Sequence, residues 1–312
     1  MVWTQTALLT ELEPVVAKEV DRHLATAQEW YPHEYVPWDE GRNFDGVLDG
    51  EPWAPEQSPV PEAARIALVV NLLTEDNLPS YHREIYNVFG GDGAWGTWVG
   101  RWTAEEGRHG TAIRDLLLVK RAVDPVALEQ ERMSHMEVGF DSSFGEDVLR
   151  SIAYVSMQEL ATRISHRNTG VISQDADTER LLAKVAADEN LHMLFYRNVL
   201  GAAMEIAPDQ ALRAVADVVQ GFQMPGSTLG GFARRSAQIA EAGIYDARIH
   251  HDQVLSPVLK VWRIFERENL GAEGEQAREQ MASYLGKLDK AASRFEERRA
   301  ARAATAEATA GG

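Results

Sequence analysis

Residues 102–110 read Trp102-Thr-Ala-Glu-Glu-Gly-Arg-His-Gly110, and this stretch decides the fold of the chain. On a helix, Glu106 and His109 share a face because they are three residues apart. The other residues of that face are apolar: Trp95, Trp98, Trp102, Ile113, and Leu116 or Leu117. A carboxylate and an imidazole in an apolar stripe are costly to bury without a partner, and Glu-x-x-His on a bundle helix most often implies a metal ion. One pair proves little, since about one is expected by chance.

A second copy of the motif makes chance a poor explanation. Glu189 and His192 form the same pair in Ala-Asp-Glu-Asn-Leu-His. Each pair is preceded by a lone acid in an apolar helix: Glu75 lies 31 residues before Glu106, and Glu159 lies 30 residues before Glu189. One Glu from each of two helices and one Glu-x-x-His from each of two others is the ligand set of carboxylate-bridged di-iron and di-manganese four-helix bundles.

The competing interpretation is that basic side chains neutralise these buried acids. The helices offer few, and Arg101 and Arg108 fall on other faces of their helix. Four carboxylates and two imidazoles suit iron or manganese, whereas zinc prefers fewer ligands and calcium avoids histidine. Spacing alone does not separate iron storage, radical generation, hydroxylation and other oxygen chemistry.

Further polar residues lie beside the six ligand candidates. Glu105 and Asp188 each directly precede a ligand pair, and we expect each to accept the second ring N–H of a ligand histidine across the bundle. Thr162, one turn after Glu159, either faces the bound oxygen or bonds its own helix backbone. For His166 we expect a hydrogen bond at a helix end, and for the tryptophans at 95, 98 and 102 a place in the core.

The composition describes an acidic globular protein. The chain has 312 residues, of which 45% are hydrophobic, a formal net charge of −17 and no cysteine. The missing cysteines exclude disulfides and thiolate chemistry, and the charge argues against general nucleic-acid binding. No apolar run approaches the roughly 20 residues that would span a bilayer, and the first residues do not resemble a signal peptide. We therefore expect a cytoplasmic protein.

The hydrophobic pattern predicts an all-α protein, with a ferritin-like four-helix core, additional helices and one domain over residues 1–299. We expect helices at about 6–29, 62–89 (kinked at Pro79), 94–121, 125–137, 146–167, 176–203, 208–222, 231–241, 249–267 and 273–299. Residues 164–170 and Met224-Pro-Gly226 are predicted turns, and Asp141–Gly145 a polar connection. Residues 30–61 contain six prolines and several aromatic residues, which predicts an extended but packed loop. Residues 300–312 are predicted to form a flexible tail.

Four motifs in register resemble the soluble acyl-(acyl carrier protein) desaturases of the stearoyl Δ9 type, here shortened to acyl-ACP desaturases. They are Thr74-Glu-Asp-Asn-Leu-Pro-Ser-Tyr81, Arg101-Trp-Thr-Ala-Glu-Glu-Gly-Arg-His-Gly110, Gln158-Glu-Leu-Ala-Thr-Arg-Ile-Ser-His-Arg-Asn-Thr169 and Ala187-Asp-Glu-Asn-Leu-His192. Residues 30–38 and 260–267 look similar too. The resemblance spans nearly the whole chain and is closest to the actinobacterial members.

This resemblance implies two iron ions per chain, bound by Glu75, Glu106, His109, Glu159, Glu189 and His192. It further implies Thr162 beside the oxygen site, and Trp30 and Asp188 on an electron path toward His109. Members of the family insert a cis double bond into a carrier-bound acyl chain with O₂ and two electrons from reduced ferredoxin, and are commonly homodimers. Hydroxylation of a carrier-bound substrate and a ferritin-like iron-binding protein are the alternatives.

Two departures from the family pattern concern its surfaces. Gly107 stands where the family usually has Asn, at a position facing away from the ligands. Residues 23–29 lack the lysines that plant members present to the acidic carrier. We therefore expect the carrier to dock on a local basic patch formed by Lys260, Arg263 and Arg267.

Overall fold

The computed structural model describes residues 2–140, 145 and 147–310. Its long helices are α1 (Gln5–Thr26), α2 (Glu62–Asp76), α3 (Leu78–Phe89), α4 (Gly93–Val119), α5 (Pro125–Val138), α6 (Val148–Ser173), α7 (Ala176–Ile206), α8 (Pro208–Gly221), α9 (Phe232–Glu241) and α12 (Ala272–Ala310). Within these residues the only β-type pairing is an isolated bridge between Phe44 and Glu51. The all-α prediction is confirmed. No helix in this part of the chain is long and apolar enough to cross a membrane.

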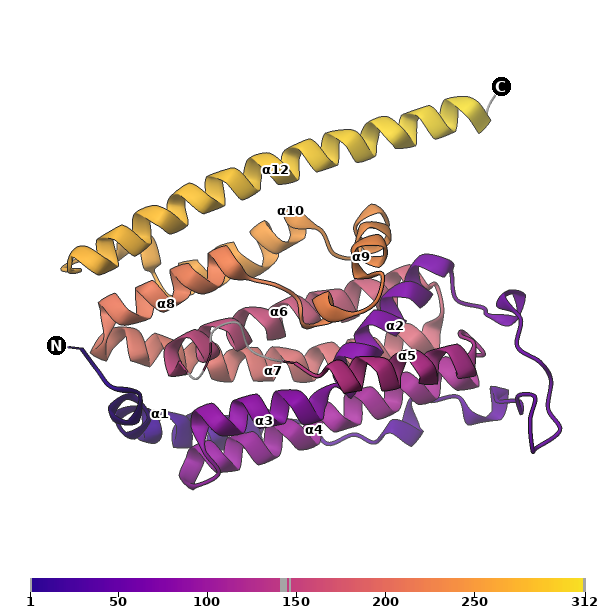
Figure 1. Ribbon diagram of the computed structural model, residues 1–312, viewed down its shortest axis with the longest axis horizontal. Helices are drawn as coiled ribbons and strands as arrows, with labels where there is room; N and C mark the ends of the chain where they lie inside the picture. Colours follow the sequence, from indigo (N-terminus) through magenta and orange to yellow (C-terminus); the bar gives the residue numbers. More distant parts are fainter. Residues whose placement is uncertain (1, 141–144, 146, 311–312) are drawn as a thin grey trace.

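The helices form a bundle with an added outer layer (Figure 1). Helices α2, α4, α6 and α7 form the inner bundle, and α1 packs against α4 and α7. Helix α8 packs between α6 and the long α12. Aromatic packing holds the inner helices together: the Trp98 ring of α4 stacks on Phe195 of α7 with centroids 3.6 Å apart. This contact lies close to the Glu-x-x-His pairs of both helices and fixes the position of α4 along α7.

The predicted helix at 62–89 is two helices that meet at Asn77. Pro79 is the second residue of α3, where its missing N–H costs no hydrogen bond. The expected kink at this proline is therefore a complete break, which leaves Glu75 in the last turn of α2.

The predicted turn at residues 164–170 is wrong, because α6 continues to Ser173. It ends at Gln174, whose backbone is left-handed with φ 52°. Gly170 sits inside the helix, where a Cβ atom would lie 3.2 Å from the Cα of Glu179 in α7. Gly170 thus marks the close approach of α6 and α7, not the end of a helix.

The region predicted as one helix at 249–267 is divided. It comprises α10 (Ala247–Ile249), the π-helical turn η5 (His250–Leu255), α11 (Ser256–Val261) and the 3-10 turn η6 (Ile264–Glu266). Pro257 has no N–H for a regular helical ladder, and the left-handed Arg263, with φ 54°, ends α11. The predicted turn at Met224–Gly226 coincides with the start of the 3-10 turn η4 (Pro225–Thr228), for which Met224 is the N-cap residue.

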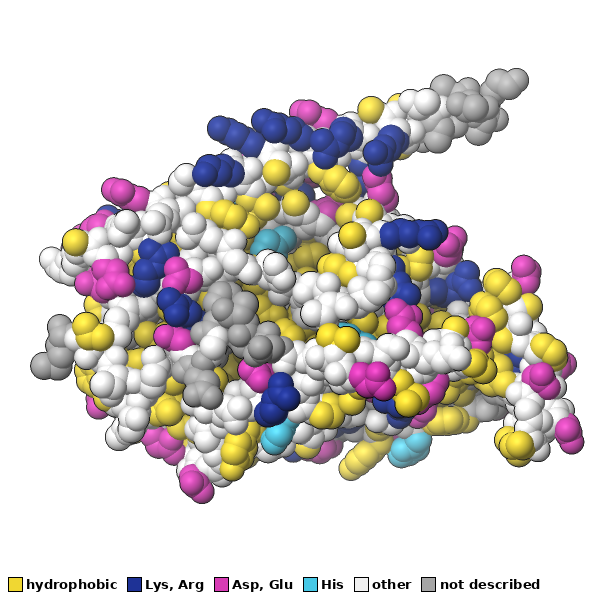
Figure 2. Space-filling model, viewed as in Figure 1, with side chains coloured by type: hydrophobic (Ala, Val, Ile, Leu, Met, Phe, Trp, Pro, Cys, Tyr) yellow, Lys and Arg dark blue, Asp and Glu magenta, His cyan; other side chains and the backbone are white. Residues whose placement is uncertain are grey.

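The C-terminal residues extend α12 beyond the predicted boundary. Residues 300–310, expected to be a tail, continue this helix as far as Ala310, whereas 311 and 312 lie outside the described residues. The predicted polar connection at 141–145 lies outside them too, except for Gly145. Helix α12 carries a row of exposed cations, the α12 stripe: Lys287, Lys290, Arg294 and Arg298. Figure 2 shows basic side chains gathered along this helix.

The loop at 30–61 is held against the bundle by a buried arginine. The guanidinium of Arg121 donates hydrogen bonds to carbonyl oxygens of the loop, including that of Glu51 at 2.9 Å, and to Gln57 Oε1 at 2.9 Å. It also lies 4.1 Å from the ring centre of Phe44. The loop contains three 3-10 turns: η1 (Pro32–Glu34), η2 (Trp38–Glu40) and η3 (Pro55–Gln57).

Candidate metal centre

The six ligand candidates converge from four helices. Glu75 comes from the end of α2, Glu106 and His109 from the middle of α4, Glu159 from α6, and Glu189 and His192 from α7. All six side chains are buried, although carboxylates are rarely buried without a partner. The structure brings together the whole set that the repeated motif nominated.

These side chains form two groups that share two members. The ligand atoms of each group lie within 4.8 Å of one another; the groups are Glu75, Glu106, His109 and Glu189, and Glu106, Glu159, Glu189 and His192. Glu106 and Glu189 belong to both groups. Shared carboxylates are the arrangement by which two neighbouring cations are bridged.

Unsatisfied atoms at the centre show that the residues fit a pair of cations. Among the buried side-chain atoms that make no hydrogen bond within the described part of the chain, five lie at this centre: His109 Nδ1, His192 Nδ1, Glu106 Oε1, Glu159 Oε2 and Glu189 Oε1. Each belongs to one of the six candidates. Buried polar atoms without partners are costly, and metal ions would satisfy all five at once.

The electrostatics of the centre point the same way. Burial, with Glu106 and Glu189 nearby, raises the pKa of Glu75 well above its usual value. Burial and Glu189 raise the pKa of Glu159 likewise. Burial would also raise the pKa of Glu106, but the adjacent His109 and His192 rings, whose Nδ1 atoms lie 3.4 Å and 2.9 Å from its carboxylate, hold that pKa below its usual value. Cations among these carboxylates would relieve their repulsion.

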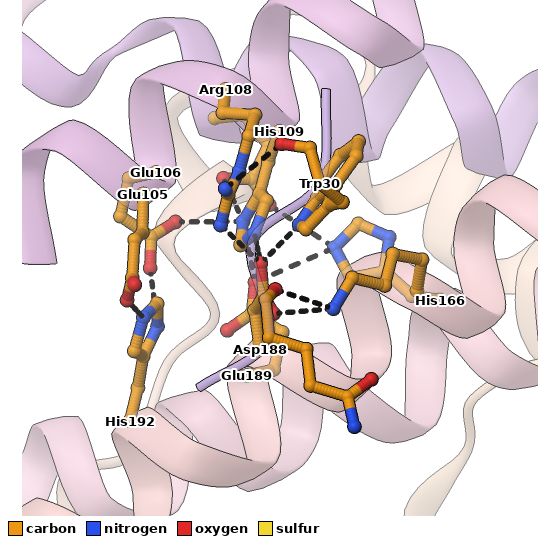
Figure 3. Close-up of polar contacts among 12 residues, drawn as sticks. Trp30, Glu105, Glu106, Arg108, His109, His166, Asp188, Glu189 and His192 are labelled. Atoms are coloured by element: carbon orange, nitrogen blue, oxygen red, sulfur yellow. Dashed lines mark hydrogen bonds and ion pairs between the residues drawn. The ribbon is translucent and has the colours of Figure 1, made fainter. Parts of the chain in front are cut away.

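Asp188 and Glu105 hold the far nitrogen of each ligand histidine across the bundle (Figure 3). Asp188 Oδ2 lies 3.3 Å from His109 Nε2, and Glu105 Oε2 lies 2.8 Å from His192 Nε2. Carboxylates at Nε2 keep the proton there, so that the unprotonated Nδ1 faces the centre and could bind a metal ion.

Trp30 and Arg108 complete the surroundings of Asp188. Trp30 Nε1 donates to Asp188 Oδ2 at 2.7 Å, and Arg108 Nη2 donates to the same oxygen at 2.8 Å. The Arg108 guanidinium also covers the Trp30 ring at 4.6 Å. The side chains that surround and hydrogen-bond the six ligand candidates are called the supporting layer. Arg108 lies outside the six candidates but contacts Asp188 and Trp30 of this layer, as Figure 3 shows.

Sequence reasoning missed two residues of this supporting layer. His23 of α1 has Nε2 3.0 Å from Glu105 Oε2, and Trp102, expected to be simply core, donates from Nε1 to Glu159 Oε1 at 2.9 Å. Trp102 is one helical turn before Glu106, so its spacing was a signal. His23 is separated from Glu105 by 82 residues, and no local pattern connects them.

His166 is also part of the centre, contrary to the expected helix-end hydrogen bond. Its Nε2 lies 3.1 Å from Glu75 Oε1, and its Nδ1 lies 3.2 Å from the side-chain nitrogen of Asn71. The expectation failed because α6 was predicted to end too early. The spacing of seven residues from Glu159, which places both on one face, was the correct signal.

The Thr162 hydroxyl bonds its own helix backbone, which is one of the two alternatives considered from the sequence, and it also reaches a carboxylate of the centre. It lies 3.1 Å from the carbonyl oxygen of Glu159 and 3.0 Å from Glu189 Oε2. A hydroxyl has one proton to donate, so it can alternate between the helix backbone and a shared carboxylate.

A largely apolar cavity opens beside the centre. Its wall includes Glu75 and Glu106, apolar side chains of α3 such as Leu78, Ile85 and Val88, and Tyr154 and Val155 of α6. A flexible hydrocarbon chain fits such a lining, and two of the six ligand candidates are exposed to it.

The three predicted docking residues differ in their surroundings. Lys260 and Arg263 are exposed, whereas Arg267 is half-buried and donates to the carbonyl of Trp262 and the carboxylate of Glu205. Arg267 thus ties the end of α7 to the segment after α11. None of the three lines the cavity.

Comparison with known proteins agrees with this geometry. The chain is 50% identical to DesA1 of Mycobacterium tuberculosis, assigned as an acyl-ACP desaturase, over 94% of this chain and 88% of the relative. It is 29% identical to the chloroplastic stearoyl-ACP 9-desaturase 2 of Arabidopsis thaliana, over 95% and 72% of the two chains. The crystal structure of DesA2 from Mycobacterium tuberculosis, also assigned as an acyl-ACP desaturase, superposes with a TM-score of 0.71 at 28% identity, covering 87% of this chain and 99% of the other.

The pattern of the family described as fatty acid desaturase matches residues 4–310. Because that match spans nearly the whole sequence and includes both Glu-x-x-His pairs, the chain belongs to the fatty acid desaturase family.

Proposed function

We propose that this desaturase introduces a cis double bond into the acyl chain of an acyl-ACP, with O₂ as oxidant and electrons from a reduced ferredoxin. In this reaction –CH₂–CH₂– becomes –CH=CH–. The two hydrogen atoms from the chain, two electrons from the donor and two protons reduce O₂ to two molecules of water. The acyl-ACP substrate rests on the relatives that carry this activity in their names.

We infer that the six ligand candidates, which form two groups with Glu106 and Glu189 in common, would hold two iron ions. Bound iron would supply O₂ activation strong enough to break an unactivated C–H bond. The observation that carries the proposal concerns two ligand candidates that also line the apolar cavity. Glu75 belongs to the first group and Glu106 to both groups. The acyl chain and the metal ligands thus share one wall.

The remaining roles belong to the protein's own side chains. The apolar walls of α3 and α6 hold the acyl chain and exclude water from the centre. Asp188 and Glu105 orient the ligand imidazoles through Nε2. The hydroxyl of Thr162, within 3.0 Å of Glu189 Oε2, is suited to donate a proton during O₂ reduction.

We further infer that the protein is a homodimer and that the carrier docks electrostatically. The homodimer rests on the family resemblance alone. Carrier proteins are acidic, so an enzyme with a net charge of −17 needs a local basic surface. Lys260 and Arg263, both exposed, are the residues proposed for this surface.

Product analysis tests the reaction. Iron-loaded protein is incubated with ferredoxin, its reductase, O₂ and a panel of acyl-ACPs, and the released fatty acids are analysed by mass spectrometry. Loss of two hydrogen atoms supports desaturation, and a gain of one oxygen atom would show hydroxylation instead. If the fatty acids show neither mass change, oxidation of a carrier-bound chain is refuted.

Metal analysis tests the site separately. His109→Ala and Glu189→Ala should each reduce the iron content below the two ions expected per chain, while the helical circular dichroism persists. Glu129→Ala, on the exposed side of α5, is the control and should keep its iron. Full iron content in both site variants would refute the ligand assignment.

A further inference from the structure

The α12 stripe has no part in the reaction proposed above. Its four side chains, Lys287, Lys290, Arg294 and Arg298, are all exposed. An α-helix turns by about 100° per residue, so the four cations project within an arc of roughly 80°. At a rise of about 1.5 Å per residue, the row they form is roughly 16 Å long. The stripe is therefore a straight, narrow row of positive charge on the outermost helix of the molecule (Figures 1 and 2).

The acids of the same helix do not neutralise the stripe. Asp289 and Glu296 are bound by Arg248 of α10, with Asp289 Oδ1 2.7 Å from Nη1 and Glu296 Oε2 3.1 Å from Nε. Glu297, the third acid of this stretch, cannot offset four cations. The side chains of the stripe make no hydrogen bond or ion pair with any residue that the structure describes. The four cations are thus available to an external partner.

The residues between the cations indicate the shape of that partner. The exposed uncharged residues from 286 to 298 are Gly286 and Ala291. Protein interfaces are centred on large anchors, which are often aromatic, and single-stranded nucleic acids stack on aromatic side chains. No such anchor is exposed on this stretch of α12. Small residues instead allow the whole row to approach a flat surface, because only the long basic side chains project from the helix.

We propose that the α12 stripe docks the protein on the surface of a lipid bilayer that contains anionic lipids. The negative charge of such a bilayer is spread over a plane, so a straight row of cations meets it along its whole length. Each cation held near the surface strengthens binding by roughly fivefold. The net charge of −17 opposes the approach, but salt screens charges beyond about 10 Å. Acids on the far side of the molecule therefore contribute little to this repulsion.

Docking through the stripe leaves the apolar cavity accessible. No residue of the stripe lines the cavity, so an acyl chain can enter while the protein lies on the bilayer. The proposed product is an unsaturated acyl chain, and the acyl-transfer reactions that incorporate such chains into lipids take place at bilayers. The stripe would therefore hold the desaturase close to the reactions that consume its product.

Sedimentation with lipid vesicles tests the proposal on the full chain. The anionic vesicles contain two parts phosphatidylcholine to one part phosphatidylglycerol, and vesicles of phosphatidylcholine alone are the uncharged reference. We expect the unaltered protein to sediment with the anionic vesicles only, and less so as the salt concentration rises. This measurement requires neither iron nor turnover, so its outcome is independent of the proposed reaction.

Two variants with equal changes in net charge locate the contact. The stripe variant combines Lys287→Gln, Lys290→Gln, Arg294→Gln and Arg298→Gln. The control variant removes four exposed cations that do not form a row, and combines Arg42→Gln, Arg83→Gln, Arg167→Gln and Arg180→Gln. The affinity of the stripe variant for anionic vesicles should fall on the order of a hundredfold, and that of the control should stay within a few fold of the unaltered protein.

Three results would overturn the proposal. The first is an unaltered protein that does not sediment with anionic vesicles at low salt, and the second is an equal loss of binding in the two variants. The third is a stripe variant that binds vesicles normally but has a raised KM for acyl-ACP, which would assign the stripe to the carrier. If circular dichroism shows that the stripe variant is misfolded, Lys287→Gln with Lys290→Gln is measured instead. Its vesicle affinity should fall on the order of tenfold, and an unchanged affinity would equally overturn the docking site.

Discussion

Glu105 Oε2 lies 2.8 Å from His192 Nε2 and 3.0 Å from His23 Nε2, so one carboxylate joins a ligand histidine to a helix outside the four-helix core. Arg101 holds the other oxygen of Glu105 through a hydrogen bond of 2.7 Å from Nε. Burial would raise the pKa of Glu105, but the hydrogen bonds with His192 and His23 hold it below its usual range. The carboxylate is therefore a fixed negative support for the His192 ring.

Glu105→Gln should weaken iron binding while the fold remains intact. An amide oxygen that accepts from both histidines leaves the amide NH₂ facing the Arg101 donor, so glutamine cannot satisfy all three partners and enforces the tautomer of His192 less strongly. We expect iron affinity to fall by roughly 10- to 100-fold, measured by titration with Fe²⁺ under anaerobic conditions. Glu129→Gln, exposed on α5, is the control, and identical affinities in the two variants would show that Glu105 does not position His192.

Thr162→Val should slow desaturation and waste oxygen. Valine keeps the shape of the side chain but removes the donor that lies 3.0 Å from Glu189 Oε2. Loss of one transition-state hydrogen bond can cost on the order of a hundredfold in rate. Iron content and melting temperature should remain close to normal. The measurement is the ratio of product formed to O₂ consumed, and an unchanged rate and ratio would mean that the hydroxyl serves only the helix backbone.

Glu84→Leu should widen the range of acyl chains that the cavity accepts. Glu84 lines the largely apolar cavity from α3 and is also 3.2 Å from Arg83 in an ion pair. An acyl chain that reaches Glu84 must remove water from a carboxylate, which is costly. We expect kcat/KM for longer acyl chains to rise about tenfold relative to shorter ones. This ratio corresponds to about 1.4 kcal/mol of desolvation cost removed with the carboxylate.

Glu84→Gln provides the matched control, because it removes the charge but keeps a polar group of the same size. Its chain-length profile should lie between those of the unaltered protein and Glu84→Leu. If all three proteins share one profile in a competition assay with mixed acyl-ACPs, Glu84 does not contribute to chain selection.

Gly170→Ala and Gly201→Ala should have opposite effects on stability. Alanine improves helix propensity by about 1 kcal/mol at either position. At Gly201 the nearest atom to a new Cβ is Trp262 Cδ1 at 3.9 Å, so this gain is kept. At Gly170 the Cβ would lie 3.2 Å from the Glu179 backbone, and overpacking costs about 1–3 kcal/mol.

Unfolding in guanidinium chloride measures both free energies, with iron analysis to confirm that the centre is intact. We expect Gly201→Ala to be more stable, and Gly170→Ala less stable, than the unaltered protein. Stabilisation of both variants would show that α6 and α7 separate without cost.

The sequence by itself determined the inner part of this protein. Helical periodicity records which residues share a face, so the repeat of Glu-x-x-His with a preceding Glu was sufficient to nominate Glu75, Glu106, His109, Glu159, Glu189 and His192 and to predict the bundle. Position in the sequence also nominated Glu105 and Asp188, because each directly precedes a Glu-x-x-His pair. These inferences depended on spacing within one helix, which an α-helix reproduces wherever it lies in the fold.

Only the tertiary structure decided what lies around that centre. His23 of α1 contacts Glu105 across 82 residues of sequence, and Trp102 of α4 donates a hydrogen bond to Glu159 of α6. The end of α6 was misjudged because Gly170, which resembles a helix stop in the sequence, instead allows α7 to approach. Such features depend on the distance and crossing angle between helices, and these follow from how side chains pack, not from the period of any one helix.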